Sequence, residues 1–366
     1  MREILHILGT RPNYVKAAPV IAAFKAMGKG QVVLNTGQHY DKSLSGDIVE
    51  SLNMSYPDVQ LSLPLGLGVC ERLAFLIKEI SNHIDLIEPS IVILYGDVDS
   101  TLAAALVASR KGVPIAHVES GLRSFDNTMP EETNRKVVDV LSSLHFVTEP
   151  SALKNLQNEG LNNTSYYVGN SMIDSLISVM DTQPYQNCKY DNSGKILLTC
   201  HRPSNVDNVD SLRRIFEMCK CLRKDLVWPM HPRTLDKLNK FDMFGDFENL
   251  SNLTIVPPLN YCDFLKMMAT STLIITDSGG IQEETTFLKT PCLTIRRNTE
   301  RPITITVGSN TLVSFEEVPE YVAAIYKKRY KASEVPQLWD GHSGVRIAKI
   351  VDEYLKTTPR MGREDE

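Results

Sequence analysis

Short apolar runs alternate with amphipathic stretches from one end of the chain to the other, and this alternation restricts the fold more than any other feature. An apolar strand, a loop, an amphipathic helix and another strand are typical of a parallel β-sheet that helices cover on both faces. The expected strands of the first half are Ile4–Leu8, Val32–Thr36, Ile91–Tyr95, Pro114–Val118, His145–Val147 and Tyr166–Val168. Those of the second half are Ile196–Thr199, Val227–Met230, Leu253–Val256, Leu273–Thr276, Cys292–Ile295 and Thr311–Val313. The sequence therefore predicts an α/β protein with doubly wound parallel sheets.

The length of 366 residues exceeds that of one ordinary core, so two domains are expected. Residues 181–194, between the two halves, are polar, contain proline, glycine and asparagine, and show no periodicity. We place the boundary region there or slightly before it, with an N-terminal domain over residues 1–172 and a C-terminal domain over residues 173–349. Two such sheets suggest a cleft between the domains, lined by the carboxyl ends of the strands.

Charge and cysteine content exclude several classes of protein. The net charge of −5 and the pI near 6.0 argue against a nucleic-acid partner, because phosphate neutralisation requires a basic face. The N-terminus lacks the apolar core of a signal peptide, and no apolar run approaches the roughly 18 residues that span a bilayer. Seven cysteines without a C-x-x-C pair favour reduced thiols over a zinc site or disulfides. We therefore expect a cytoplasmic protein with no metal and no membrane partner.

The first expected strand ends in Gly9, and a helix follows that carries Arg11 and Lys16 near its start. Backbone N–H groups, the helix dipole and Arg11 would favour a phosphate there, although a glycine turn with a solvated arginine explains the segment equally well. It is neither a P-loop nor G-x-G-x-x-G, and no G-x-G-x-x-G follows any expected strand. A nicotinamide cofactor therefore has no obvious site.

Acidic residues follow two strands of the first half and open a later helix, at Asp97, Glu119 and Glu131. Since the carboxyl ends of parallel strands share one edge of the sheet, the three acids converge and form a plausible acid–base set. Helix starts also attract acids, so one of Glu131 and Glu132 has the alternative role of serving the helix dipole.

In the second half, two strand ends carry a histidine and an arginine each, at His201 and His231, which resembles an anion-binding rim. The strongest signal is Ser278-Gly279-Gly280 between a strand and a helix, where bare N–H groups can hold a diphosphate. Glu284, one turn into that helix, could accept hydrogen bonds from ribose hydroxyls. Arg301 adds another cation after the next strand. Phe264, on the preceding helix, either stacks on the base of a nucleotide or is an ordinary core aromatic.

The ordered set of these segments resembles the non-hydrolysing UDP-N-acetylglucosamine 2-epimerases. The matching segments, from residue 9 to residue 302, are GTRPNYVKAAP, TGQHYD, GDVDSTLAA, HVESGLRS, MPEETNR, VGNSMID, HRP, HPRT and TDSGGIQEE…TERP. The resemblance implies the GT-B fold, with two Rossmann-like domains facing a central cleft and a final helix, about residues 350–366, that packs back onto the first domain. It also implies a homodimer, a UDP-sugar substrate, and no NAD or catalytic metal.

Carried over position by position, the resemblance also implies roles for single residues. Catalytic roles are implied for Asp97, Glu119, Glu131 and His201. Substrate contacts are implied for Arg11, Lys16, Arg135, Phe264, Ser278, Gly279 and Glu284. Gln38 and His39 match a segment that builds an activating UDP-N-acetylglucosamine site in some members, but this chain continues Tyr40-Asp41 where many members have Arg-Glu or Arg-Gln.

The implied reaction inverts C2 of UDP-N-acetylglucosamine. Because the hydrogen on C2 is barely acidic, UDP leaves first, a 2-acetamidoglucal forms, and UDP adds again after a proton returns on the other face. Competing interpretations are a hydrolysing 2-epimerase, a 2-epimerase of a related UDP-acetamido sugar, a GT-B glycosyltransferase, and a nucleotide-sugar sensor without activity.

Overall fold

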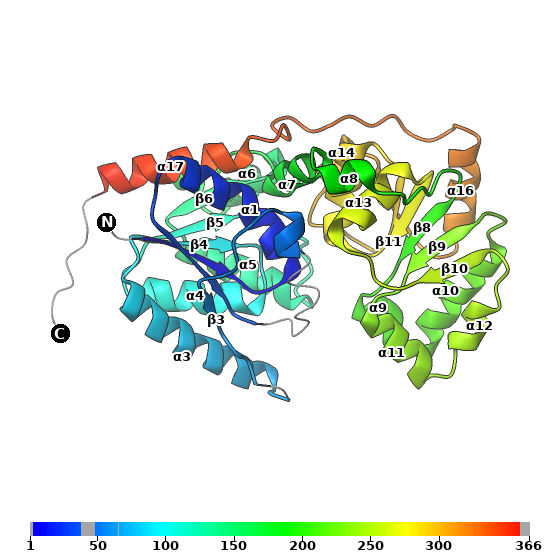
Figure 1. Cartoon of the computed structure of the whole chain (residues 1–366), viewed down its shortest axis with the longest axis horizontal. Coiled ribbons are helices and arrows are strands. Elements are labelled where there is room, and N and C mark those ends of the chain that lie inside the picture. The colour runs from blue at the N-terminus through cyan, green and yellow to red at the C-terminus, as the bar shows by residue number, and fades with distance from the viewer. Residues whose placement is uncertain (1–2, 38–47, 65, 359–366) are drawn as a thin grey trace. The chain divides into compact units, whose positions relative to one another are not determined.

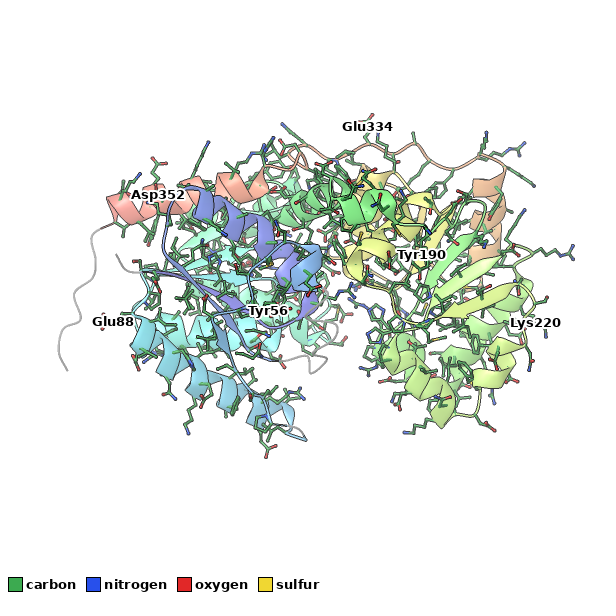
Figure 2. The ribbon with its side chains drawn as sticks, in the orientation of Figure 1. Tyr56, Glu88, Tyr190, Lys220, Glu334 and Asp352 are labelled. Carbon is green, nitrogen blue, oxygen red and sulfur yellow. The ribbon has the colours of Figure 1, made fainter. Side chains whose placement is uncertain are left out.

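The computed structural model describes residues 3–37, 48–64 and 66–358 of the chain. Two compact units are present, which we describe separately: unit 1 comprises Met1–Ser178 and Gln337–Glu366, and unit 2 comprises Val179–Pro336. Side chains such as Tyr56, Glu88 and Lys220 are exposed on the surface of their own unit (Figure 2). Gln38 and His39, the suggested activating site, lie outside the described residues.

Unit 1 is built on a parallel sheet of seven strands in the order β3-β2-β1-β4-β5-β6-β7. Its strands are β1 Ile4–Leu8, β2 Gln31–Asn35, β3 Val59–Gln60, β4 Ile91–Tyr95, β5 Ile115–Val118, β6 Leu144–Val147 and β7 Ser165–Tyr167. The central strands are buried along their whole length, as expected for a sheet that helices cover on both faces. The strand order reverses between β1 and β4, which is where sheets of this kind bind ligands.

Helices cover both faces of this sheet (Figure 1). Its helices are α1 Arg11–Ala26, α3 Val69–Ile87, α4 Asp99–Arg110, α5 Pro130–Leu141, α6 Pro150–Asn158, α7 Ser171–Met180 and α17 Ser343–Thr357. Apolar side chains of α3, α4 and α5 pack with those of the central strands into one buried cluster. On the other face, α17 lies alongside α1 (Figure 1). Gly344 makes this approach possible, because a Cβ at that position would lie 2.5 Å from the carbonyl oxygen of Pro19.

Unit 2 repeats the architecture with six parallel strands in the order β10-β9-β8-β11-β12-β13. Its strands are β8 Ile196–Thr199, β9 Leu226–Pro229, β10 Leu253–Val256, β11 Leu273–Thr276, β12 Cys292–Ile295 and β13 Asn310–Val313. Its helices are α8 Gln183–Asn187, α9 Pro203–Val206, α10 Val209–Cys221, α11 Pro232–Lys240, α12 Phe244–Glu248, α13 Tyr261–Thr270, α14 Gly279–Leu288, α15 Ile303–Thr306 and α16 Val318–Tyr326. The strand order reverses between β8 and β11, which makes these two strand ends the expected ligand position of this unit.

The division between the units differs from the predicted boundaries. Residues 173–178 belong to unit 1, because α7 packs there and the Ser175 hydroxyl donates a hydrogen bond to the carbonyl oxygen of Val15 at 2.6 Å. Residues 337–349 also return to unit 1, where the indole N–H of Trp339 donates to the carbonyl oxygen of Thr148 at 2.9 Å. The returning helix α17, Ser343–Thr357, overlaps the predicted range of about 350–366, of which residues 359–366 lie outside the described part.

Candidate functional site

The loop after β1 is organised by Asn13, near the start of α1. Its Oδ1 accepts hydrogen bonds from the backbone N–H groups of Gly9 at 3.1 Å and Thr10 at 2.9 Å. Its Nδ2 donates to the carbonyl oxygen of Tyr95 at 2.7 Å, which ties the end of β1 to the end of β4. Asn13 therefore occupies the N–H groups of Gly9 and Thr10, which the sequence analysis had considered for a phosphate.

Lys16 and Glu119 form a buried ion pair beside the end of β4, and their exposed fractions are 7% and 4%. Glu119 has a φ of 70°, in the left-handed region that a residue with a side chain occupies only where its surroundings hold it. Gly96, with a φ of 68°, leaves room for the pair: a Cβ there would lie 3.0 Å from Lys16 Nζ and 3.2 Å from Glu119 Oε2. The missing side chain at position 96 therefore lets Lys16 and Glu119 close against the β4 loop.

Asp97, the next residue, pairs with Arg135 of α5. The Arg135 side chain is 2% exposed and that of Asp97 is 20% exposed, so this carboxylate remains accessible. Arg135 Nη1 also lies 3.0 Å from Glu132 Oε2, and Glu132 accepts hydrogen bonds from the Ser124 N–H at 2.8 Å and its hydroxyl at 2.9 Å. Burial alone would raise the pKa of Glu132, but the Ser124 hydrogen bonds and the Arg135 charge lower it overall.

The two acids that open α5 differ in their burial and their contacts. Glu132 is fully buried and holds the preceding loop, whereas Glu131 is exposed in the first turn of the helix. Glu131 and Arg135 are four residues apart on α5, so they lie on the same face of the helix. Asp97 and Glu119 therefore stand on adjacent strand ends, and Glu131 lies on the helix whose arginine binds Asp97.

A buried network behind these loops was missed by sequence reasoning. Asp139 of α5 accepts a hydrogen bond from the Gly121 N–H at 3.1 Å, and its Oδ1 lies 2.7 Å from His117 Nδ1. The other nitrogen of His117 lies 2.8 Å from the carbonyl oxygen of Gly96. Burial alone would raise the pKa of Asp139, but His117 and Arg123 lower it overall. One carboxylate thus connects both acid-bearing loops, directly at Gly121 and through His117 at Gly96.

In unit 2, the two loops at the β8/β11 position are joined by Asp277, which sequence reasoning also passed over. Asp277 is fully buried and accepts backbone hydrogen bonds from His201 at 3.0 and 3.1 Å and from Arg202 at 2.9 Å. The His201 ring stacks on the His231 ring, with centroids 5.0 Å apart and planes at 23°. The two predicted histidines are therefore neighbours. The His231 Nδ1 accepts a hydrogen bond from the Arg233 N–H at 3.1 Å, which caps α11.

The turn from β11 into α14 has the features expected of a diphosphate loop. Ser278 is the N-cap residue of α14, and its own hydroxyl makes no capping hydrogen bond to the helix. Gly279 lies against a buried charged pair: a Cβ there would be 2.9 Å from Arg301 Nη1 and 3.1 Å from Glu300 Oε1. Arg301 Nε lies 2.9 Å from Glu283 Oε2, which connects this cation to α14. Arg301 thus lies beside this turn, paired with carboxylates of Glu283 and Glu300, and Gly280 follows in the first turn of α14.

The predicted ribose-binding acid is held one turn further along α14. Glu284 is 5% exposed, and its Oε1 accepts a hydrogen bond from the Tyr261 hydroxyl at 2.9 Å. Tyr261 opens α13, the helix that also carries the partly buried Phe264. Because α13 packs on α14, the suggested base-stacking aromatic and the suggested ribose acid lie on neighbouring helices.

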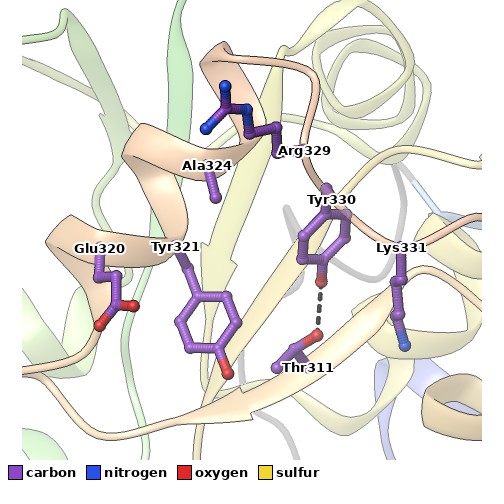
Figure 3. A pocket seen from close by; sticks show the side chains of 7 residues that line it. All are labelled: Thr311, Glu320, Tyr321, Ala324, Arg329, Tyr330 and Lys331. Atoms are coloured by element: carbon purple, nitrogen blue, oxygen red, sulfur yellow. Dashed lines mark hydrogen bonds between the residues drawn. The ribbon is translucent and has the colours of Figure 1, made fainter.

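Other features bear on cofactors and ligands. Among the described residues, no group of three histidine, cysteine, aspartate or glutamate side chains is placed to hold a metal ion. The helices of the described residues likewise include none that could serve as a membrane span. A pocket of about 310 Å³ lies between β13 and α16, where the hydroxyls of Thr311 and Tyr330 are 2.6 Å apart (Figure 3). None of the predicted site residues lines this pocket, so we do not assign the substrate to it.

Comparisons with known proteins point to one family. A family model described as UDP-N-acetylglucosamine 2-epimerase matches residues 24–352. The UDP-N-acetylglucosamine 2-epimerase of Methanocaldococcus jannaschii is 35% identical over 357 residues, which cover 94% of this chain and 97% of that protein. The UDP-2,3-diacetamido-2,3-dideoxy-D-glucuronate 2-epimerase of Pseudomonas aeruginosa is 35% identical over 320 residues, 85% of this chain and 88% of that protein.

Solved structures agree with the sequence comparison. The crystal structure of the Methanocaldococcus jannaschii enzyme in complex with UDP-GlcNAc and UDP matches with a TM-score of 0.88 and covers 96% of this chain and 99% of that chain. A putative UDP-N-acetylglucosamine 2-epimerase from Listeria monocytogenes matches with a TM-score of 0.84 at 27% identity, over 100% of this chain and 99% of that chain. The predicted fold class, GT-B with two Rossmann-like sheets, is thereby confirmed. The chain belongs to the UDP-N-acetylglucosamine 2-epimerase family.

Proposed function

We propose that the chain interconverts UDP-N-acetylglucosamine and UDP-N-acetylmannosamine by inverting C2, without releasing free sugar. The observation that supports this most is the arrangement in unit 1 of two acids on adjacent strand ends, each with its own buried cation. Glu119 pairs with Lys16, and Asp97 pairs with Arg135. Carboxylates held in place in this way are the kind of group that accepts a proton or stabilises a developing positive charge.

The proposed route begins with loss of UDP because C2 bears an amide nitrogen, and a carboxylate alone could not remove its hydrogen. The C1–O bond breaks and its electron pair goes to the departing diphosphate, which leaves positive charge on C1. The hydrogen on C2 then becomes acidic, a carboxylate takes the proton, and the C1–C2 double bond of a 2-acetamidoglucal forms. Return of a proton to the other face of C2, with re-addition of UDP to C1, gives the manno isomer.

In this scheme, Glu119 and Asp97 serve the sugar ring, with Glu131 as the third acid of the set. Glu119 is held most tightly, because its backbone conformation and its bond to Lys16 both fix the carboxylate. Asp97 and Glu131 are more exposed and both lie beside Arg135, which suits groups that meet a substrate entering from solvent. The residues of unit 1 thus supply the acid–base and charge-stabilising chemistry of the proposal.

The nucleotide contacts of the proposal come from unit 2. The α14 N-terminus at Ser278 and Gly279, with Arg301 beside it, offers N–H groups and a cation to the diphosphate. Glu284 on the same helix and Phe264 on the packed helix α13 are proposed for the ribose and the base. His201 is proposed to bind the departing diphosphate.

The test is NMR of the purified protein with UDP-N-acetylglucosamine and no other substrate. We expect signals of UDP-N-acetylmannosamine that grow to a constant ratio with the substrate. Accumulation of UDP with free N-acetylmannosamine would show a hydrolysing 2-epimerase instead. Lack of any turnover, with UDP still bound, would contradict the proposal and favour a transferase that lacks its acceptor or a nucleotide-sugar sensor.

A related UDP-acetamido sugar is a second candidate substrate. The observation that favours it is the Pseudomonas aeruginosa relative, named for a diacetamido glucuronate, which is 35% identical to this chain, as is the Methanocaldococcus jannaschii enzyme. The ratio of kcat/KM for the two UDP-sugars decides between them, because the preferred sugar must fit the loops after β4 and β5 better in the transition state.

A further inference from the structure

Asp277 joins two loops at the position where the strand order of unit 2 reverses. It follows β11, its N–H donates to the carbonyl oxygen of Thr199 at the end of β8 at 3.3 Å, and its side chain is fully buried. The carboxylate accepts hydrogen bonds from the N–H groups of His201 and Arg202 and from Asn205 Nδ2 at 3.0 Å. A buried carboxylate is costly unless donors surround it, so these contacts fix the β8–α9 loop in one conformation.

The His201 ring is held on two sides by these surroundings. Its Nδ1 lies 3.4 Å from Asp277 Oδ1, which is an ion-pair distance when the ring is protonated. One ring face stacks on His231. With Nδ1 turned to the carboxylate, Nε2 is the ring nitrogen left for a ligand, and the side chain is 35% exposed. Asp277 thus holds the backbone that carries His201 and lies on the Nδ1 side of its ring.

We propose that Asp277 is a positioning residue: its carboxylate faces Nδ1–H of the His201 imidazolium, so that the second hydrogen, on Nε2, meets the diphosphate oxygen leaving C1; this rests on the proposed function. When the C1–O bond breaks, its electron pair goes to that oxygen, and a hydrogen bond from a correctly placed Nε2–H stabilises the new charge. The proton stays on the ring, so re-addition of UDP needs no further group. Asp277 touches no substrate and acts through His201.

The test is a double-mutant cycle on kcat, measured by NMR of C2 epimerisation. Asp277→Asn should lower kcat about 100-fold, the size typical of losing an oriented donor, while the dissociation constant for UDP changes less than about 3-fold. In a His201→Gln background, Asp277→Asn should cause no further loss, because the group through which it acts is already gone. Asn205→Ala is the matched control: it removes another donor of the same carboxylate without touching His201, and should leave kcat within about 3-fold.

Several outcomes would overturn the proposal. Independent losses that add in the double variant would show that Asp277 merely stabilises the loop. An equal loss in Asn205→Ala would show the same. If Asp277→Asn does not fold, Asp277→Glu keeps the charge but moves the carboxylate by one methylene group, and the same cycle applies: again no further loss is expected in His201→Gln. An inactive wild-type protein would refute the proposed function, whereas an active wild type with an additive cycle would refute only the role of Asp277.

Discussion

Replacement of Gly96 by alanine should separate the effect of a displaced ion pair from that of backbone strain. Its φ of 68° costs a residue with a Cβ about 1–2 kcal/mol, which lowers Tm by about 2–8 °C in a unit of this size. The new Cβ would also lie 3.0 Å from Lys16 Nζ and 3.2 Å from Glu119 Oε2, so the pair must move by a few tenths of an ångström or more. Misplacing a catalytic group by an ångström lowers the rate about 100-fold. Because the expected shift is smaller than that, we expect kcat to fall by roughly 10- to 100-fold.

Gly112→Ala is the matched control for this change. Gly112 has a φ of 64°, close to that of Gly96, but nothing lies within 4 Å of the Cβ that alanine would add. Gly112→Ala should therefore lose only the stability that its backbone strain costs, whereas Gly96→Ala should lose at least as much and should alone lose epimerase activity. Equal activity of the two variants would refute the argument that the Lys16–Glu119 pair must close against residue 96.

Four further predictions follow from other parts of the site. Glu119→Gln should lower kcat by orders of magnitude while calorimetry still shows UDP binding; near-normal turnover would remove this acid from the mechanism. A metal chelator should leave the epimerisation rate unchanged. A clear loss of activity would contradict the proposal that side chains catalyse the reaction without a metal ion. Gly279→Ala should weaken UDP binding, because its Cβ would lie 2.9 Å from Arg301 Nη1, whereas Gly245→Ala, with nothing within 4 Å, should bind UDP normally. Burial raises the pKa of Asp174 to about 6. Because the pKa of Asp174 is higher in the folded than in the unfolded state, protonation favours folding. As the pH rises from about 4 through about 6, the free energy of unfolding of the wild type should therefore fall by up to about 3 kcal/mol relative to that of Asp174→Asn. Melting curves on both sides of this range measure the difference, and one that is independent of pH would contradict the assigned burial.

The sequence predicted the parts of the fold that follow from local pattern. Buried parallel strands are continuous apolar runs, so β1 and β4 could be located to the residue. β3 was missed because two residues, Val59–Gln60, carry no recognisable period. The domain boundaries were displaced because the segment that returns to unit 1 is fixed by contacts such as Trp339 with Thr148, which lie far apart in sequence.

The candidate site shows the same limit. The placement of Asp97 and Glu119 at adjacent strand ends could be predicted, since the edge of a parallel sheet brings such residues together. The residues that hold them were not: Asn13, Asp139 and Asp277 act through hydrogen bonds to loops distant in sequence. The choice between Glu131 and Glu132 was likewise open, because both suit the first turn of a helix and burial alone tells them apart.

Turnover in D2O tests the central claim most directly, because the proposed route exchanges the hydrogen on C2 with solvent. NMR of the recovered UDP-sugars should show deuterium at C2 of both epimers, and the Glu119→Gln protein should incorporate it far more slowly. Epimers that form while C2 retains its original hydrogen would contradict the elimination of UDP and the role of the carboxylates.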